Sequence, residues 1–226
     1  MTYRQNPVRW VDEMLEASRR KLEKSVPPEW MPSGDELGCG SFGCVYPTHV
    51  PDIVVKFTTD DTEFEFARVL SAKMQSDAVV RYHKALRMPV MQPLSGKPVF
   101  ALWRDAADHV GHMMSWISRH YGDQLAERSH SAMKAQSQAS WFAWAKLQKL
   151  RRPDPEEAKR IIRPALAAWH QVGQVPVAEL QDLAQAVAGA LTWDRVFFAD
   201  IRSPNLGQVG DRWVITDPGH VVVIAR

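Results

Sequence analysis

The first half of the chain combines one helical pattern with several strand patterns. Apolar residues at helical spacing over 7–24 predict an amphipathic helix, which a pair of prolines ends. Glycines followed by alternating valines over 37–57 predict two short strands, a turn and a third strand. After a short return of helical spacing, the segments 78–87 and 98–103 predict two more strands, separated by a loop rich in proline, glycine and serine.

The second half is helical first and strand-like only at its end. Over 106–191 the apolar spacing of a helix is interrupted at Gly122, at Arg152-Pro153 and at Gly173, which predicts consecutive helices. The segments RVFFAD, NLGQVGDRWVITD and HVVVI then predict short strands, with a turn at Gly210-Asp211. A β-rich part, a helical part and a small β-rich close together predict an α+β fold with two lobes.

Composition excludes several classes of protein. The 226 residues are 45% hydrophobic and 24% charged with a net charge of +2, which argues against a disordered chain, a coiled coil and binding of nucleic acid through whole-chain charge. No apolar run reaches the roughly 18 residues of a membrane span, and MTYRQNPVRW lacks the layout of a secretory signal. We therefore expect a cytoplasmic protein with no membrane partner. Two cysteines, Cys39 and Cys44, are too few for a disulfide framework, and we expect both to be reduced.

The clearest motif is glycine-rich. The run LGCGSFGCVY satisfies G-x-G-x-x-G-x-V with Gly38, Gly40, Gly43 and Val45. Glycines let a turn approach phosphate groups closely and present backbone N–H groups to them, and a valine just beyond can pack on an adenine ring. A dinucleotide-binding turn would need a helix directly after the motif. Strand-like residues follow instead, so the sequence favours a loop that covers the phosphates of ATP.

A lysine on the next predicted strand extends this motif. Lys56 lies in IVVKF, and in kinases such a lysine reaches the α- and β-phosphates and is held by a glutamate of the following helix. Glu63 and Glu65 are the candidate partners. Apolar residues lie three, four and seven positions after Glu63, whereas Arg68 lies three after Glu65. Glu63 is therefore predicted to face inward and pair with Lys56, and Glu65 is left with the option of a capping box with Thr62.

Two further motifs lie near the C-terminus in a fixed order. Asp200 is followed five residues later by Asn205, and Asp217 begins Asp-Pro-Gly. With the glycine-rich loop and Lys56, these residues resemble the protein-kinase-like superfamily, which includes protein kinases and small-molecule kinases of the aminoglycoside phosphotransferase type. The first motif is similar to the catalytic loop D-x-x-x-x-N and the second to D-F-G. Arg202 stands where protein kinases often carry a lysine that steadies the transferred phosphoryl group.

The resemblance implies a fold, a site and an activity. The fold would be bilobal, with a helical extension over 1–32, a small β-rich N-lobe over 33–102 and a reduced, mainly helical C-lobe over 103–226. Asp200 would act as the catalytic base beside Arg202, while Asn205 and Asp217 would hold Mg²⁺. The ATP-binding residues would be Gly38, Gly40, Ser41, Phe42, Gly43, Val45, Lys56, Glu63 and Trp103, the last supplying backbone contacts to adenine between the lobes.

The sequence also departs from the kinase pattern. Phe198-Ala199 replaces the His-Arg or His-Gly pair before the catalytic aspartate, and only seven residues follow Gly219. We therefore expect no activation segment and no conventional peptide-docking groove. The expected function is transfer of the γ-phosphoryl group of ATP to a hydroxyl of a protein, the chain itself included, or of a small molecule.

Three other hypotheses remain open. The chain could be a pseudokinase-like module that holds nucleotide and acts through a protein partner, or an enzyme of the same fold that transfers AMP. The basic residues between Lys146 and Arg163 indicate a solvated helix end, which the helix dipole favours, with a surface for an acidic substrate or nucleic acid as the alternative.

Overall fold

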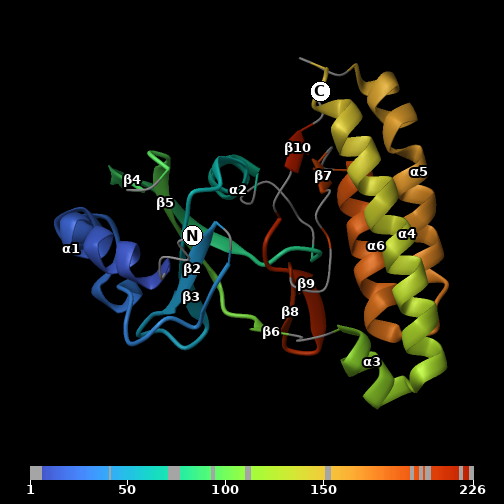
Figure 1. Ribbon diagram of the computed structural model, residues 1–226, viewed down its shortest axis with the longest axis horizontal. Coiled ribbons are helices and arrows are strands. Elements are labelled where there is room, and N and C mark those ends of the chain that lie inside the picture. The colour runs from blue at the N-terminus through green and yellow to red at the C-terminus, as the bar shows by residue number, and fades with distance from the viewer. Residues whose placement is uncertain are drawn as a thin grey trace, which may run out of the picture. The chain divides into compact units, whose positions relative to one another are not determined.

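The computed structural model gives an α+β architecture with antiparallel strand ladders (Figure 1). The chain divides into two units, the first made of residues 1–72 and 81–106 and the second of 73–80 and 107–226. Each unit has its own strands and its own helices. The residues that the structure describes are 7–40, 42–70, 77–92, 95–109, 113–150, 154–193, 196–198, 201, 205–218 and 221–223.

A five-stranded antiparallel sheet forms the centre of the first unit. Its strands lie in the order β1-β2-β3-β5-β4, so β5, the last of these strands in the sequence, lies inside the sheet and not at its edge. Consecutive residues of β3 and β5 are buried, which means that both faces of these two strands are covered by helical elements and loops. The strands are β1 (Gly38–Cys39), β2 (Gly43–Pro47), β3 (Ile53–Thr58), β4 (Tyr82–Met91) and β5 (Pro98–Asp105).

The strand predicted at 78–87 begins later than its sequence pattern suggested. β4 starts at Tyr82, whereas residues 78–80 belong to the second unit. The backbone N–H of Ile215 donates to Ala78 O at 2.8 Å, and the N–H of Val80 donates to Ile215 O at 3.1 Å. The apolar residues of 78–87 form one continuous strand pattern, but the structure divides them between the two units. Periodicity alone cannot show where such a division falls.

The N-terminal helix α1 (Pro7–Ser25) belongs to the core of the first unit. Its apolar stripe, with Val11 and Leu22 fully covered, packs in one cluster with Val55 and Phe57 of β3. A single 3₁₀ turn, η1 (Pro28–Trp30), then turns the chain, and Trp103 Nε1 donates to the carbonyl of Trp30 at 2.7 Å. The segment predicted as an extension thus supplies part of the interior of this unit.

A short helical segment follows β3. It consists of α2 (Asp61–Glu65) and a π-helical turn, η2 (Phe66–Leu70). Asp60 caps α2, since its Oδ1 accepts hydrogen bonds from the backbone N–H groups of Thr62 at 2.9 Å and Glu63 at 3.3 Å. The capping box with Glu65 is not formed, because Asp60 already occupies the capping position and Glu65 pairs with Arg68 at 2.8 Å.

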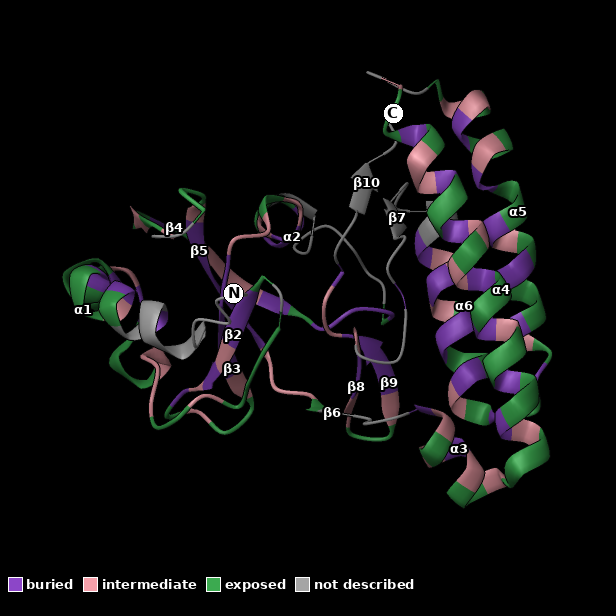
Figure 2. Cartoon of the chain, viewed as in Figure 1, coloured by how far each residue is buried: buried purple, intermediate pink, exposed green. Residues whose placement is uncertain are grey.

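The second unit contains the predicted run of helices. The helices are separated at Gly122 and after Gly173, where the sequence pattern placed interruptions, and α4 ends at Leu147 before α5 begins at Pro155. The interruption predicted at Arg152-Pro153 lies outside the described residues. In the second of these helices, the buried residues recur every three to four positions. They form one face, and the neighbouring helices pack next to it (Figure 2). The four helices are α3 (Met113–Tyr121), α4 (Asp123–Leu147), α5 (Pro155–Gly173) and α6 (Ala178–Trp193).

Short strands complete the second unit. β8 and β9 form a hairpin whose turn contains Gly210 at a φ of 61°, a left-handed conformation that suits glycine. The two-residue β6, which the sequence did not predict, pairs with β8. β7 pairs with β10 in a separate antiparallel ribbon. The bounds are β6 (Asp108–His109), β7 (Val196–Phe198), β8 (Leu206–Val209), β9 (Arg212–Ile215) and β10 (Val221–Val223). Within the described part of the chain, no helix combines the length and apolar character that crossing a bilayer requires.

The expectation of two reduced cysteines is wrong in this structure. Cys39 and Cys44 lie directly opposite each other across β1 and β2, with their Cα atoms 4.1 Å apart, and form a disulfide bond. Counting cysteines gave the wrong answer because the pairing depends on the register of the hairpin. Residues that face each other at a position without ladder hydrogen bonds are close enough for their side chains to meet.

Candidate functional site

The glycine-rich motif forms a hairpin at the edge of the first sheet. β1 and β2 are its arms, and the backbone N–H of Gly40 donates to Gly43 O at 2.8 Å across the turn. One arm is well anchored, since β2 pairs along its length with β3 and Phe42 O accepts a hydrogen bond from Thr59 N at 2.8 Å. The other arm, β1, is an exposed edge strand of two residues. The hairpin is therefore joined to the rest of the sheet through β2 alone, and its outer arm is tied to β2 by backbone pairing and by the Cys39–Cys44 bond.

The three glycines of the motif meet different constraints. A Cβ atom at Gly43 would lie 1.9 Å from Phe57 O, so the packing of β2 on β3 requires glycine there. At Gly38 and Gly40 a Cβ atom would meet nothing within 4 Å among the described residues, and neither residue has a positive φ. The fold of the chain therefore does not explain these two glycines. A ligand that approaches their backbone closely would explain them.

Lys56 and Glu63 form a buried ion pair. Lys56 lies on β3 directly opposite Val45 of the hairpin, and its Nζ donates to Glu63 Oε2 at 2.7 Å. The side chain of Lys56 is 8% exposed and that of Glu63 is fully covered. Of the two candidate glutamates, the structure thus pairs Glu63 with the lysine, as the helical spacing indicated. Removing two charges from water is costly, and such pairs concentrate at functional sites.

Tyr82 is a member of this site that the sequence analysis did not identify. Its hydroxyl donates to Glu63 Oε1 at 2.9 Å, so the two oxygens of the carboxylate are bonded to two different partners. Tyr82 is buried at the start of β4, and its ring meets Phe66 edge to face at 5.8 Å. Phe66 follows Glu63 by three residues on the same face of the helical segment. The apolar spacing predicts that this face of the helical segment points inward, but no local pattern indicates which strand it meets.

Asn205 and Asp217 lie at the open end of the β8–β9 hairpin in the second unit. Asn205 immediately precedes β8, and its carbonyl accepts a hydrogen bond from Thr216 N at 2.8 Å. Asp217 follows Thr216, so the ladder brings the two predicted metal ligands to the same end of one hairpin. Both are partly exposed. An amide oxygen and a carboxylate are hard donors of the kind that Mg²⁺ prefers, so their chemistry fits this ion.

The two residues predicted for catalysis, Asp200 and Arg202, fall outside the described part of the chain. Ser41, predicted to bind ATP in the glycine-rich loop, also lies outside it. The structure does describe Phe198, which ends β7, and Ile201, which is buried. Because Phe198 pairs with Val221, the last residue of β7 and the first residue of β10 lie at the same end of one ribbon.

Trp103 is an interior residue of the first unit. It lies within β5 opposite Val55, its side chain is fully covered, and its indole N–H is taken by Trp30. The strand continues for two residues beyond it to Asp105, and the change of unit falls after Ala106. The side chain therefore serves the core.

Metal-binding clusters of the common kind are not found among the described residues. No group of three or more histidine, cysteine, aspartate or glutamate side chains is placed to hold an ion there. The two expected magnesium ligands, Asn205 and Asp217, do not form such a group, since one of them is an asparagine.

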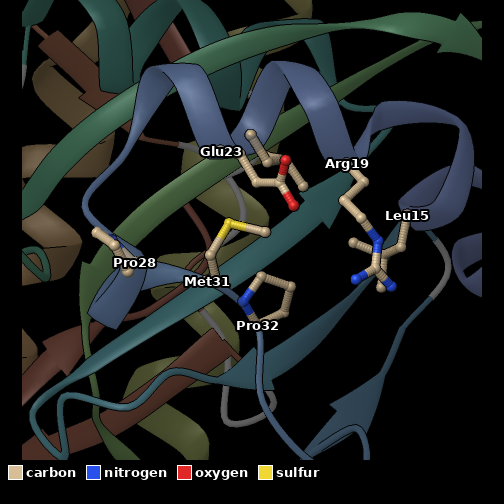
Figure 3. Close-up of a pocket in the computed structure, with 7 residues that line it drawn as sticks. Leu15, Arg19, Glu23, Pro28, Met31 and Pro32 are labelled. Atoms are coloured by element: carbon tan, nitrogen blue, oxygen red, sulfur yellow. The ribbon is translucent and has the colours of Figure 1, made fainter.

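A cavity of about 420 Å³ lies elsewhere in the first unit (Figure 3). Leu15, Arg19 and Glu23 of α1 face the segment that contains Pro28 and Met31 across it. None of the predicted site residues lines this cavity. It is a cavity of the helix packing and not part of the glycine-rich hairpin.

Comparison of the whole chain with protein-family models and with curated proteins finds no match. The assignment of a function to this chain therefore depends on its own residues and on their arrangement within each unit.

Proposed function

We propose that the chain is an ATP- and Mg²⁺-dependent phosphotransferase with a bilobal kinase-like fold, which moves the γ-phosphoryl group to a hydroxyl acceptor. The observation that carries the proposal is the buried Lys56–Glu63 pair beside the glycine-rich hairpin. A compact ammonium group held by a carboxylate is a fixed positive charge for phosphate oxygens. The two unexplained glycines of the hairpin support the same ligand, because they leave its backbone open to close approach.

The division of labour follows from the chemistry of each group. Gly38 and Gly40 would present backbone N–H groups to the phosphates, and Lys56 would bind their oxygens. Asn205 and Asp217 would hold Mg²⁺, which when bound neutralises charge on the phosphates. Asp200 would orient the acceptor hydroxyl and take its proton.

The first experiment follows labelled ATP. The purified protein is incubated with Mg²⁺ and either γ-labelled or α-labelled ATP, alone and with candidate acceptors. Phosphotransfer predicts label on an acceptor or on the chain itself from the γ position only. Label from the α position would instead show transfer of AMP.

The matched variants are two aspartates of the same hairpin. Asp217→Ala removes a proposed magnesium ligand at the open end, and Asp211→Ala removes an exposed carboxylate in the turn at the closed end. Transfer should be lost in the first variant and kept in the second. Equal loss in both would mean that the hairpin matters only as structure, and equal retention would remove Asp217 from the site.

The second candidate function is a nucleotide-holding module that acts through a partner. The replacement of the His-Arg pair by Phe198-Ala199 favours it. It predicts measurable binding of ATP by calorimetry with no transfer of either label. Absence of both binding and transfer would overturn the two candidates together.

A further inference from the structure

The disulfide bond lies inside the motif that is proposed to bind phosphate. Cys39 and Cys44 flank the turn of the glycine-rich hairpin and are the two cysteines of the chain. Cys39 is exposed on the edge strand β1, whereas Cys44 is fully covered in the core of the first unit. The bond therefore joins the least anchored strand of the sheet to its interior.

The bond contributes less to the stability of the whole fold than a disulfide that closes a long loop. It closes a ring of only six residues, and a cross-link over so short a loop removes less entropy from the unfolded chain than one over a longer loop. Its effect is local. Without it, the outer arm of the hairpin is tied to β2 by the backbone pairing of the two strands, with Leu37 N donating to Val45 O and Gly40 N to Gly43 O, both at 2.8 Å.

The disulfide bond constrains the backbone of the two glycines that the fold does not explain. Gly38 and Gly40 are the immediate neighbours of Cys39, and both are exposed. Fixing Cys39 to a core residue fixes the backbone on either side of it. A site whose donors are already in place binds its ligand more tightly than one whose donors must be ordered first.

We propose that Cys39 and Cys44 are a thiol–disulfide modification site that regulates nucleotide binding at the hairpin. The inference rests on the proposed function. The oxidised form holds Gly38 and Gly40 in position and binds ATP tightly, and the dithiol form frees the outer arm and binds ATP more weakly. The reactant is a small or protein dithiol for reduction, and its disulfide form for oxidation.

Accessibility sets the course of the reduction. A thiolate of the dithiol attacks Cys39 Sγ, because that residue is exposed, and the bond to Cys44 Sγ breaks. Cys44 leaves as a thiolate and takes up a proton. The second thiolate of the reductant then attacks the mixed disulfide, releasing Cys39. Two electrons pass from the reductant to the protein, one S–S bond is lost and one is formed in the reductant, so the exchange balances.

The test measures ATP affinity in both redox states of the whole protein. Wild type is oxidised with a disulfide reagent or reduced with dithiothreitol, the state is verified by thiol alkylation and mass, and binding of Mg·ATP is titrated calorimetrically. The oxidised form should bind about fivefold or more tightly, which is at the lower end of ordinary coupling between sites. Cys39→Ser, which leaves the buried Cys44 in place, should bind like the reduced form and ignore the reductant.

Reciprocity supplies an independent readout. If oxidation tightens ATP binding fivefold, ATP must make the disulfide fivefold harder to reduce. For this two-electron couple that factor corresponds to a potential lower by about 20 mV in saturating ATP. A redox titration against glutathione, with and without ATP, measures it.

The outcomes separate the two proposals. Equal ATP binding by the oxidised and reduced forms, or free thiols that persist in excess oxidant, would overturn the regulation while leaving the proposed function intact. Absence of ATP binding in both forms would overturn the proposed function, and the regulation with it.

Discussion

Replacing Lys56 by methionine should destabilise the protein strongly. Methionine replaces the unbranched stem of the lysine and removes its charge, so Glu63 stays covered without the ammonium group at 2.7 Å. At an effective dielectric constant of about 20, two unit charges at that separation attract by roughly 6 kcal/mol, a gross value that the cost of burying both ions offsets. Removing one partner of such a pair typically costs about 3–5 kcal/mol. This is a large part of the about 5–15 kcal/mol by which a domain is stable.

The assay is equilibrium unfolding in urea, followed by tryptophan fluorescence and by circular dichroism. Coincident transitions show that one free energy of unfolding describes the process. The matched control is Arg68→Met, which breaks the exposed ion pair with Glu65 a few residues away and should leave the midpoint unchanged. Lys56→Met/Glu63→Gln removes both buried charges while keeping an acceptor for Tyr82, and it should be more stable than Lys56→Met alone.

Two results would refute this reasoning. If Lys56→Met shifted the midpoint no more than Arg68→Met does, the pair would not be energetically buried. If the double variant were less stable than the single one, the loss would come from packing of the lysine stem and not from the unpaired carboxylate. Either result would also weaken the case for a fixed positive charge beside the hairpin.

Two further predictions concern other parts of the chain. Gly43→Ala should lower the midpoint of thermal unfolding, because its Cβ atom would lie 1.9 Å from Phe57 O. Gly38→Ala should keep the midpoint and weaken ATP binding. The same midpoint for both variants would contradict this distinction. In the second unit, the hydrogen bond from Tyr121 to Glu179 at 2.8 Å raises the pKa of that phenol above its ordinary value, with burial and the charge of Glu179 adding to the effect. The stabilisation is therefore present below the ordinary tyrosine pKa and is lost as the pH rises through the raised pKa. Glu179→Gln should let the phenol ionise at lower pH in a phenolate absorbance titration, and an unchanged titration curve would exclude the interaction.

Local periodicity predicted those features that a single element determines. The choice of Glu63 over Glu65 needed only the spacing of apolar residues along one helical segment, and that spacing holds in the structure. The breaks between the helices of the second unit follow from glycines and prolines for the same reason. In each case the information lies within a few residues of the position it decides.

Features that depend on which strands meet could not be predicted. Tyr82 lies nineteen positions after Glu63 in the sequence. It reaches the glutamate because β4 lies beside β5 in the sheet. Cys39 and Cys44 bond because the hairpin register sets them face to face. The segment 78–80 pairs with Ile215, more than a hundred residues away in sequence. Strand pairing is a non-local property, and one sequence gives no direct measure of it.

The excursion of residues 73–80 has a consequence for how the protein can be produced in pieces. The chain enters the second unit, returns to the first and leaves it again after Ala106, so no single cut separates the two units. A fragment that begins at Ala107 lacks the segment whose backbone bonds to Ile215 on β9, and it leaves the polar groups on that side of the strand without their partners. Such a fragment should be poorly soluble on its own. Coexpression with residues 1–106 would supply the missing segment in trans.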